Sequence, residues 1–364
     1  MSRFALEPHP SPVSPERRAA LLEAPAFGTV FTDHMARITW RAGGAGWAGW
    51  RDRRLVPYGP LELSPATSAL HYAQEIFEGL KAYRWPDGSI RTFRPTANAE
   101  RFARSARRLA LPELPVEDFL DSLAALVEVD QAWVPSQPGT SLYLRPFMFA
   151  SEPFIGVRAS HEVSYLVIAS PVGAYFKGGV APVSIWVDQD YHRAGPGGTG
   201  AAKCGGNYAA SLVSQETAYS HGCEQVLFLD AATSTHLEEL GGMNVVVVMA
   251  DGSVVTPPTS GTILEGVTRS SLLQLVRDRG LAVTERPVEL ADLLTGLRSG
   301  AVAEVFACGT AAVVTPVGRL AGADFDVTVG DGHPGALTMS LYEELTGIQY
   351  GRVKDRHDWT HRLI

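Results

Sequence analysis

The chain has 364 residues, of which 45% are hydrophobic and 19% charged, and its formal net charge at pH 7 is −8. This length and composition predict a soluble, globular protein of two domains with a large buried core. The acidic balance argues against a nucleic-acid partner, and no apolar run reaches the roughly 20 residues that a membrane span needs.

Three cysteines, Cys204, Cys223 and Cys308, lie far apart and form no CxxC pair. Such an odd, scattered set fits a reducing compartment better than a disulfide framework. The first 15 residues lack the apolar core of a signal peptide. We therefore expect a cytoplasmic protein without a metal site, and the sequence assigns no role to the three thiols.

The N-terminal half of the chain predicts a short arm followed by a small domain. Residues 1–30 are rich in proline, alanine and charge, which is typical of a poorly ordered arm. In the small domain, residues 31–172, Pro86-Asp87-Gly88 predicts a β-hairpin turn and Asn98 a helix N-cap. The expected strands are 35–40, 55–57, 80–85, 89–94, 141–150 and 163–170, and the expected helices are 98–109 and 116–129.

The glycine-rich segment 173–182 follows a β-branched strand and predicts an interdomain loop. The large C-terminal domain beyond it, residues 183–364, is richer in strands. Its expected strands are 183–188, 225–230, 243–249, 253–256, 281–287, 304–307 and 312–316, and its expected helices are 207–220, 267–279, 290–297 and 336–345.

The stretch 195–212 holds one ionisable side chain, Lys203, among glycines, alanines and other residues that are neutral at pH 7. A desolvated lysine can lose its proton and become the nucleophilic amine that a Schiff base requires. A solvated lysine on a surface loop is the plain alternative. Against it, the stretch runs directly into an apolar helix, whose first residues include Tyr208.

Other stretches supply what an aldehyde cofactor with a phosphate needs. Glu239 lies between two apolar strands and precedes a glycine pair, although an exposed hairpin acid would have the same neighbours. The backbone N–H groups of Val267 and Thr268 open a helix, a position that favours phosphate. A cation could come from Arg101 or Arg104, and the residues alone do not choose between them.

Several motifs together resemble the branched-chain amino-acid aminotransferases. The likeness runs from about Phe31 to the C-terminus, with the motifs in order and at plausible spacing. The motifs are 71–81 (HYAQEIFEGLK), Arg101 with Ser105-Ala106, 142–146 (LYLRP), 199–211 (TGAAKCGGNYAAS), 239–244 (ELGGMN), 265–269 (EGVTR) and 304–311 (EVFACGTA).

This resemblance implies a fold-type IV pyridoxal-phosphate enzyme of the α+β or α/β class. Its small N-terminal α/β domain would be followed by a larger C-terminal domain with a β-barrel-like core flanked by helices, and the chain would form a homodimer. The implied reaction is transamination between leucine, isoleucine or valine and 2-oxoglutarate, which gives branched 2-oxo acids and L-glutamate.

The resemblance also assigns roles to cofactor-binding residues. Lys203 would form the Schiff base and move the substrate α-proton, Tyr208 would meet the phenolic oxygen, and Glu239 would pair with the ring nitrogen. Gly242 stands where some relatives carry threonine, so a side-chain hydroxyl contact is lost there. Leu264 would pack on the ring, and Arg101, Val267, Thr268 and Thr310 would hold the phosphate.

For the substrate, Arg145 would receive the distal carboxylate of glutamate, and the N–H groups of Thr310 and Ala311 would receive the α-carboxylate. An aromatic wall suits the branched side chain. Taken singly, each of these aromatic residues is more often plain core packing, and only the resemblance assigns it to the wall. The wall residues are Tyr72, Phe77, Tyr143 and Tyr175.

Two other interpretations stay open from the sequence. Another fold-type IV enzyme, such as a D-amino-acid aminotransferase or aminodeoxychorismate lyase, would share Lys203 and Glu239 but not the substrate pocket. A non-catalytic binding protein or a nucleotide binder is also conceivable, although no GxGxxG follows a strand and opens a helix. The residues do not rank leucine, isoleucine and valine, or give the direction of the reaction in the cell.

Overall fold

The computed structural model describes residues 3–43, 49–173 and 180–364. The chain divides into two compact units. Unit 1 comprises Met1–Tyr175, Ala202–Gly205 and Gly347–Ile364, and unit 2 comprises Phe176–Ala201 and Gly206–Thr346. Two short segments that the sequence assigned to the C-terminal domain, 202–205 and 347–364, therefore belong with unit 1. Most of the expected interdomain loop, residues 174–179, lies outside the described residues.

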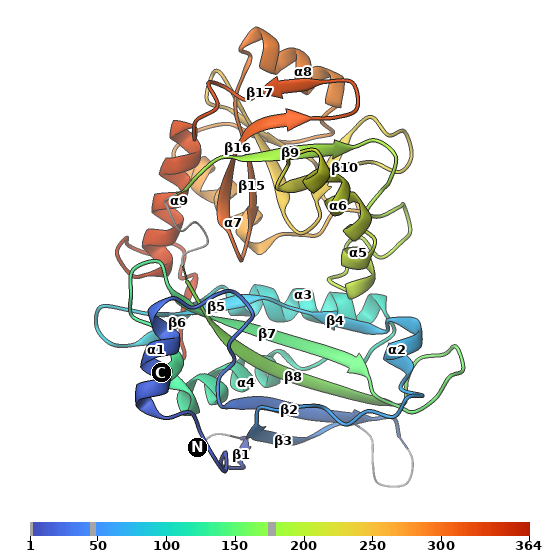
Figure 1. Cartoon of the computed structure of the whole chain (residues 1–364), viewed down its shortest axis with the longest axis vertical. Coiled ribbons are helices and arrows are strands. Elements are labelled where there is room, and N and C mark those ends of the chain that lie inside the picture. Colours follow the sequence, from blue (N-terminus) through green and yellow to red (C-terminus); the bar gives the residue numbers. More distant parts are fainter. Residues whose placement is uncertain (1–2, 44–48, 174–179) are drawn as a thin grey trace. The chain divides into compact units, whose positions relative to one another are not determined.

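Unit 1 is built on one nine-stranded sheet with the order β1-β3-β2-β8-β7-β5-β6-β18, and β4 pairs with β7. Figure 1 shows β7 and β8 in green beside β2 and β3 in blue. The strands are β1 (Ala5–Leu6), β2 (His34–Arg41), β3 (Gly49–Pro57), β4 (Glu75–Phe77), β5 (Leu80–Arg84), β6 (Ile90–Phe93), β7 (Ser141–Ala150), β8 (Glu162–Val172) and β18 (Thr360–Arg362).

The sheet of unit 1 has one face packed against helices, and its other face, here termed the open face, carries a cavity and a smaller buried apolar group. Side chains alternate between the faces of a strand, so Ala36 and Ile38 of β2 enter the core with Phe102 and Phe119. The alternate residues of β7 and β8 therefore lie on the open face. The helices are α1 (Pro15–Glu23), α2 (Ser68–Tyr72), α3 (Pro95–Arg108), α4 (Val116–Val129) and the 3-10 helix η1 (Gln131–Trp133).

The predicted β-hairpin is present, with β5 and β6 paired antiparallel on either side of residues 85–89. Asp87 Oδ1 accepts the backbone N–H of Ser89 at 2.9 Å, and Gly88 has a φ of 83°. The Asp87 carboxylate and the positive φ of Gly88 therefore provide the expected turn chemistry.

Residues 3–30, expected to be a poorly ordered arm, adopt defined structure. β1 pairs in parallel with β3, and Phe4 is buried in the core of unit 1. The backbone N–H of His9 also donates to His34 Nε2 at 3.2 Å. A two-residue strand and one buried aromatic side chain give too little periodicity to be recognised in a proline-rich segment.

The expected N-cap at Asn98 is wrong. Helix α3 begins at Pro95, after Arg94 with a φ of 48°, so Asn98 lies inside its first turn. The buried Asn98 amide instead donates to Glu78 Oε2 at 2.9 Å. Proline at the first helical position, where no N–H is needed, is the stronger start signal.

Unit 2 contains a closed barrel. Its sheet has the order β11-β10-β9-β16-β15-β12-β13-β14, and pairing of β11 with β12 closes β9, β10, β11, β12, β15 and β16 into a ring. The predicted barrel-like core is confirmed. The strands are β9 (Val183–Asp188), β10 (Gln225–Leu229), β11 (Leu237–Leu240), β12 (Asn244–Met249), β13 (Val254–Thr256), β14 (Val283–Glu285), β15 (Val302–Gly309), β16 (Val313–Ala321) and β17 (Asp326–Thr328).

The helix expected over 207–220 is divided into α5 and α6, because Ala210 and Ser211 form a turn. The other helices expected in this half of the chain are present. The helices are α5 (Gly205–Ala209), α6 (Leu212–Ser220), α7 (Val267–Asp278), α8 (Leu290–Ser299) and α9 (Ala336–Gln349).

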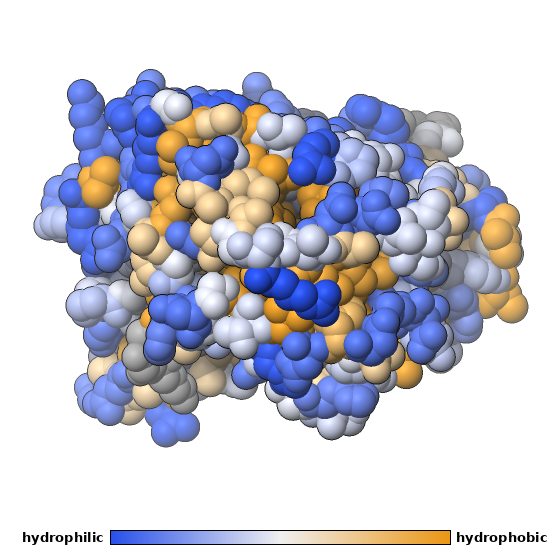
Figure 2. Space-filling model, turned by 90° about the horizontal axis from the view of Figure 1, so that it is seen from above, coloured by the Kyte–Doolittle hydropathy of each residue, from blue (hydrophilic) through white to orange (hydrophobic). Residues whose placement is uncertain are grey.

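In the described part of the chain, no helix combines the length and apolarity required for crossing a bilayer. Figure 2 shows hydrophilic and hydrophobic residues interleaved on the face seen from above, with the orange areas broken up by blue side chains. Scattered apolar residues of this kind are normal on protein surfaces.

Candidate active site

Lys203 lies in the four-residue segment that belongs with unit 1, and its backbone is held on both sides. Its N–H donates to Ser105 Oγ of α3 at 2.9 Å, and its carbonyl accepts the Phe77 N–H at 3.0 Å. Two residues later, the N–H of Gly205 donates to Glu75 Oε1. The lysine is therefore fixed between a helix and the short strand β4.

The Lys203 amine lies 4.6 Å from the centre of the Phe77 ring, and the Arg145 guanidinium carbon lies 4.8 Å from the same ring. An aromatic ring attracts cations over its face, so Phe77 can stabilise the Arg145 guanidinium while it lies beside the Lys203 amine. Burial raises the pKa of Glu75, and the Gly205 N–H and Arg145 oppose that rise. The predicted residues Lys203, Phe77 and Arg145 therefore share one part of unit 1.

Arg145 and Tyr143 project from β7 onto the open face of the sheet. Arg145 Nη2 donates to the Tyr143 hydroxyl at 3.0 Å, whereas its buried Nε has no hydrogen-bond partner among the described residues. Gly79 makes room for this tyrosine, because a Cβ at Gly79 would overlap the Tyr143 hydroxyl. A guanidinium next to an aromatic ring and a phenol can bind a carboxylate or pack against an apolar chain.

The other two predicted wall residues are not placed in this group. Tyr72, at the end of α2, is 41% exposed, and its hydroxyl donates to the carbonyl of Ile155. Tyr175 lies outside the described residues.

Arg101, which the resemblance assigned to the phosphate, and Arg104, which the residues alone left as an alternative, differ clearly in the structure. Arg104 is exposed, whereas Arg101 is buried and forms a double ion pair with Glu78 (Nε–Oε1 2.7 Å, Nη2–Oε2 2.9 Å). Arg101 shares a helix face with Ser105, which holds the Lys203 backbone. Burial alone would raise the pKa of Glu78, but Arg101, with Lys203 and Asn98, holds it below its usual value.

The barrel of unit 2 places Glu239 at one of its ends. Glu239 pairs with Asn244 in the sheet register, and Asn244 pairs with Cys308, so these residues form a row across three strands. Thr310 and Ala311 occupy the turn that follows between β15 and β16. Residues from two separate motifs, 239–244 and 304–311, therefore lie at the same end of the barrel.

The buried Glu239 carboxylate is held by several donors. Oε1 accepts the Leu264 N–H at 2.8 Å, and Oε2 accepts the Asn244 amide at 3.3 Å. Arg193 Nη2 also lies 2.5 Å from Oε1. Sequence reasoning missed Arg193, because an arginine in a loop after a strand carries no signal until its partner is known.

Helix α7 begins close to the same carboxylate. Its N-cap, Gly266, adopts an extended conformation and leaves the first N–H groups, including those of Val267 and Thr268, at the helix start. A Cβ at Gly266 would overlap the Asn244 side chain, so only glycine permits this approach. On α5, the Tyr208 ring is 3.4 Å from where a Cβ at Gly242 would stand.

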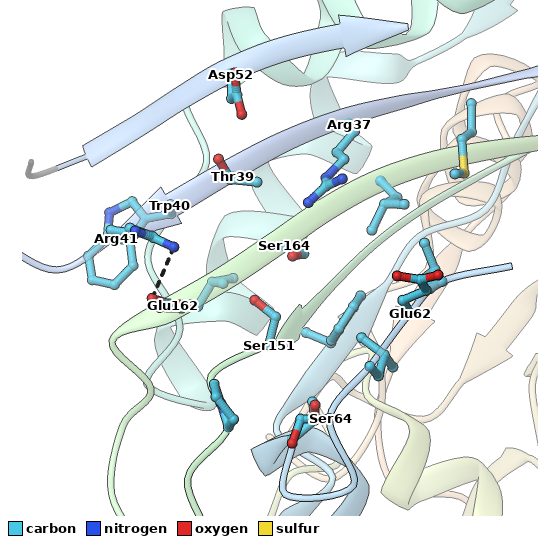
Figure 3. A pocket seen from close by; sticks show the side chains of 18 of the residues that line it. Arg37, Thr39, Trp40, Arg41, Asp52, Glu62, Ser64, Ser151, Glu162 and Ser164 are labelled. Atoms are coloured by element: carbon cyan, nitrogen blue, oxygen red, sulfur yellow. Dashed lines mark ion pairs between the residues drawn. The ribbon is translucent and has the colours of Figure 1, made fainter. Parts of the chain in front are cut away.

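The open face of unit 1 also carries a cavity of about 980 Å³. Figure 3 shows Arg37 and Thr39 of β2 and Ser164 of β8 around it, with Arg41 paired to Glu162 at 3.2 Å. None of the predicted site residues is among the described residues that line it. In the described ranges, no cluster of three or more His, Cys, Asp or Glu side chains is arranged to hold a metal ion.

Comparisons with known proteins agree on one family. The family model "Amino-transferase class IV" matches residues 75–320. A branched-chain-amino-acid aminotransferase of Mycobacterium tuberculosis is 53% identical over 357 residues, covering 97% of this chain and 96% of the relative. Branched-chain-amino-acid aminotransferase 2 of Bacillus subtilis is 44% identical over 335 residues, covering 92% of this chain and 91% of the relative.

Solved structures give the same result at lower identity. The branched-chain aminotransferase of the thermophilic archaeon Thermoproteus uzoniensis, with norvaline, has a TM-score of 0.73 and 25% identity, covering 90% of this chain and 100% of that chain. The Escherichia coli branched-chain amino acid aminotransferase has a TM-score of 0.70 and 25% identity, covering 90% of this chain and 99% of that chain. Another branched-chain amino acid aminotransferase, solved with pyridoxamine 5′-phosphate, has a TM-score of 0.75 and 26% identity, with the same two coverages.

The Glu78–Arg101 pair generates a prediction about stability. Glu78→Gln leaves the Arg101 charge buried without its counter-ion, so we expect a loss of roughly 3–5 kcal/mol in the free energy of unfolding. Because the folded pKa of Glu78 is lowered, its contribution is complete above the usual carboxyl range and disappears as the pH falls through the folded pKa. Urea unfolding followed at several pH values measures both effects.

The matched control is Glu113→Gln, which removes the partner of the exposed Arg107 and should change the unfolding midpoint little. A deficit in Glu78→Gln as small as that of the control, or one that persists undiminished at acid pH, would contradict the assignment.

Proposed function

The chain belongs to the class IV aminotransferases and, within them, to the branched-chain-amino-acid aminotransferases, and from this premise we propose that it exchanges the amino group between leucine, isoleucine or valine and 2-oxoglutarate. The observation that carries the proposal is Lys203, whose backbone is held on both sides and whose amine lies over Phe77. The products would be the branched 2-oxo acid and L-glutamate.

We propose pyridoxal 5′-phosphate as the cofactor, because the donor set of unit 2 fits it. A buried carboxylate held in place by N–H donors, Glu239, suits a protonated ring nitrogen, and the N–H groups of Val267 and Thr268 suit a phosphate. Gly242, without a side chain, leaves backbone space beside the Tyr208 ring. When bound, the cofactor supplies an aldehyde that captures the substrate amine and a ring that withdraws electrons from it.

In unit 2, we assign Glu239 to hold the ring-nitrogen proton and Tyr208 to donate to the phenolic oxygen. Leu264 would pack against the ring, with its own N–H occupied by Glu239. Thr310 joins the phosphate-binding N–H groups, and with Ala311 it also offers N–H groups to the substrate α-carboxylate. A fixed set of donors of this kind costs no reorganisation when charge develops.

In unit 1, we assign Lys203 Nζ as the base that takes the α-proton of the substrate and later returns it. Arg101 would bind phosphate oxygens while Glu78 fixes the orientation of its guanidinium. The ring of Phe77, beside Arg145, suits a branched aliphatic chain, and the guanidinium itself suits the distal carboxylate of glutamate. Tyr72 and Tyr175 stay proposed wall residues.

The proposed role of Lys203 leads to a prediction about activity. Lys203→Ala removes both the amine that binds the cofactor and the proton-transfer base, so turnover of leucine with 2-oxoglutarate should fall by at least about a hundredfold. The visible absorption band of the purified protein should also disappear. Lys354→Ala, which alters an exposed lysine, should keep both. A Lys203→Ala protein that retained its band and its turnover would exclude the proposal.

The proposed role of Arg145 predicts how the enzyme distinguishes acidic from apolar substrates. Arg145→Ala should lower kcat/KM for glutamate roughly 10- to 100-fold more than kcat/KM for leucine, because only glutamate has a distal carboxylate. Tyr143→Phe keeps the ring and removes the hydroxyl that Arg145 contacts. We expect it to lower kcat/KM for glutamate more than kcat/KM for leucine, but by less than Arg145→Ala does. Equal losses for both substrates in Arg145→Ala would remove the assignment.

We also infer a cytoplasmic homodimer, with the open face of unit 1 as its interface. This face carries the 980 Å³ cavity, whose lining includes arginines and acids together with the edge of the buried group of Met35, Phe149 and Leu166, and a surface with both charge signs can pair with its own copy. Sedimentation should give twice the mass of one chain. Ile168→Arg, at a half-buried position beside this group, should give monomers, whereas Leu6→Arg, at a position 49% exposed, should not.

A monomeric native protein would exclude the dimer. A dimer that Ile168→Arg leaves unchanged would exclude the open face as its interface.

A further inference from the structure

Arg193 links three segments of unit 2 from a position that the sequence did not single out. It follows β9, and its side chain is only 4% exposed. Its Nη2 lies 2.5 Å from Glu239 Oε1, and it also donates to the carbonyls of Gly200 (3.1 Å) and Thr262 (2.5 Å). One guanidinium nitrogen thus joins the strand of Glu239 to two loops.

The two loops approach closely, and Arg193 bonds to both of them where they meet. A Cβ at Gly200 would overlap the Thr262 carbonyl, so a glycine is required there. The N–H of Ala201 also donates to the carbonyl of Gly261 at 3.1 Å. The first loop continues into the Lys203 segment, and the second carries Leu264, whose N–H binds Glu239.

The charge of Arg193 matters for Glu239 because both groups are buried. A carboxylate taken out of water is stable as the anion only when a cation and N–H donors compensate the lost hydration. Leu264 and Asn244 supply neutral donors to Glu239, and Arg193 is its ion-pair partner, while the buried Arg269 of α7 acts on the neighbouring Cys308. Without the Arg193 charge, the carboxyl group would favour its protonated form.

We propose that Arg193 is a positioning residue that keeps Glu239 ionised and fixed in orientation before the cofactor binds. The catalytic part of this inference rests on the proposed function, in which Glu239 holds the proton of the ring nitrogen. A protonated carboxyl group could not accept that proton. Arg193 acts through Glu239 and through the two loops.

Other titratable groups near Glu239 define the controls. Burial raises the pKa of the Cys308 thiol to about 12, so this thiol stays neutral over the working range. Burial also raises the pKa of Glu238, and Thr262 and Arg193 oppose that rise, whereas Asp230 adds to it and His192 lowers it. Glu238 therefore also experiences the Arg193 charge, although no ion pair between them is formed.

The first test uses the protein without cofactor and needs no activity. Arg193→Gln should lower the midpoint of thermal unfolding by roughly 5–15 °C, because it strands the Glu239 charge. The folded pKa of Glu239 would then lie above its unfolded value, so the deficit should grow as the pH rises from about 5 to 8. Arg279→Gln, which breaks the partly buried pair with Glu344, should show no such pH dependence.

Double variants separate a charge effect from simple packing. Adding Glu239→Gln to Arg193→Gln removes the stranded charge and should restore a large part of the lost midpoint. Adding Glu238→Gln to Arg193→Gln instead should not restore the midpoint of thermal unfolding. If Arg193 served only to tie the Gly200 and Thr262 carbonyls, neither second substitution would help, and this result would overturn the proposal.

The second test uses the holoenzyme. Arg193→Gln should shift the pH at which the visible band of the bound cofactor changes, and Arg193→Lys, which keeps a charge, should return it toward the native value. A native profile in Arg193→Gln would overturn the inference while leaving the Lys203 result intact. Loss of the visible band in Lys203→Ala would support the role of Lys203 in binding the cofactor. Retention of the band in Arg193→Gln, with a shifted pH profile, would support the separate positioning role of Arg193.

Discussion

The need to compensate buried carboxylates controls the chemistry of both units. An ionised carboxylate in a protein interior is stable only when a cation and hydrogen-bond donors replace its hydration. Unit 1 meets this need with Arg101 on Glu78, and unit 2 meets it with Arg193 on Glu239. Each pair stands beside an element that we propose to act in the reaction, the lysine segment in one unit and the start of α7 in the other. The charges that hold the fold are thus also close to those proposed for the reaction.

The closed barrel explains how distant motifs can act together. Because β12 pairs with both β11 and β15, Glu239, Asn244 and Cys308 stand in one row, although 69 positions separate the first from the last. Closure also removes free strand edges, so the register cannot slip easily. A rigid end of this kind suits donors that must stay in place while a substrate changes beside them.

Much of the fold and part of the candidate site could be predicted from the sequence. Long strands such as β7 and β8 and the amphipathic helix α4 have clear periodicity, and Lys203 stands out because its neighbours are small and neutral. The residues alone could not choose Arg101 over Arg104, since that choice depends on which face of α3 packs inward, and only the family resemblance assigned Arg101. Arg193 was equally hidden, because its role exists only through a partner 46 positions away.

Strand β7 serves two purposes at once. Leu142, Leu144 and Met148 enter the core, whereas Tyr143 and Arg145 alternate with them on the other face. Inserting or deleting a single residue here would exchange the two sets, driving a guanidinium into the core and leucines onto the opposite face. The proposed substrate contacts of this strand can therefore be altered by substitution at fixed length, whereas a change in its length would also disrupt the core.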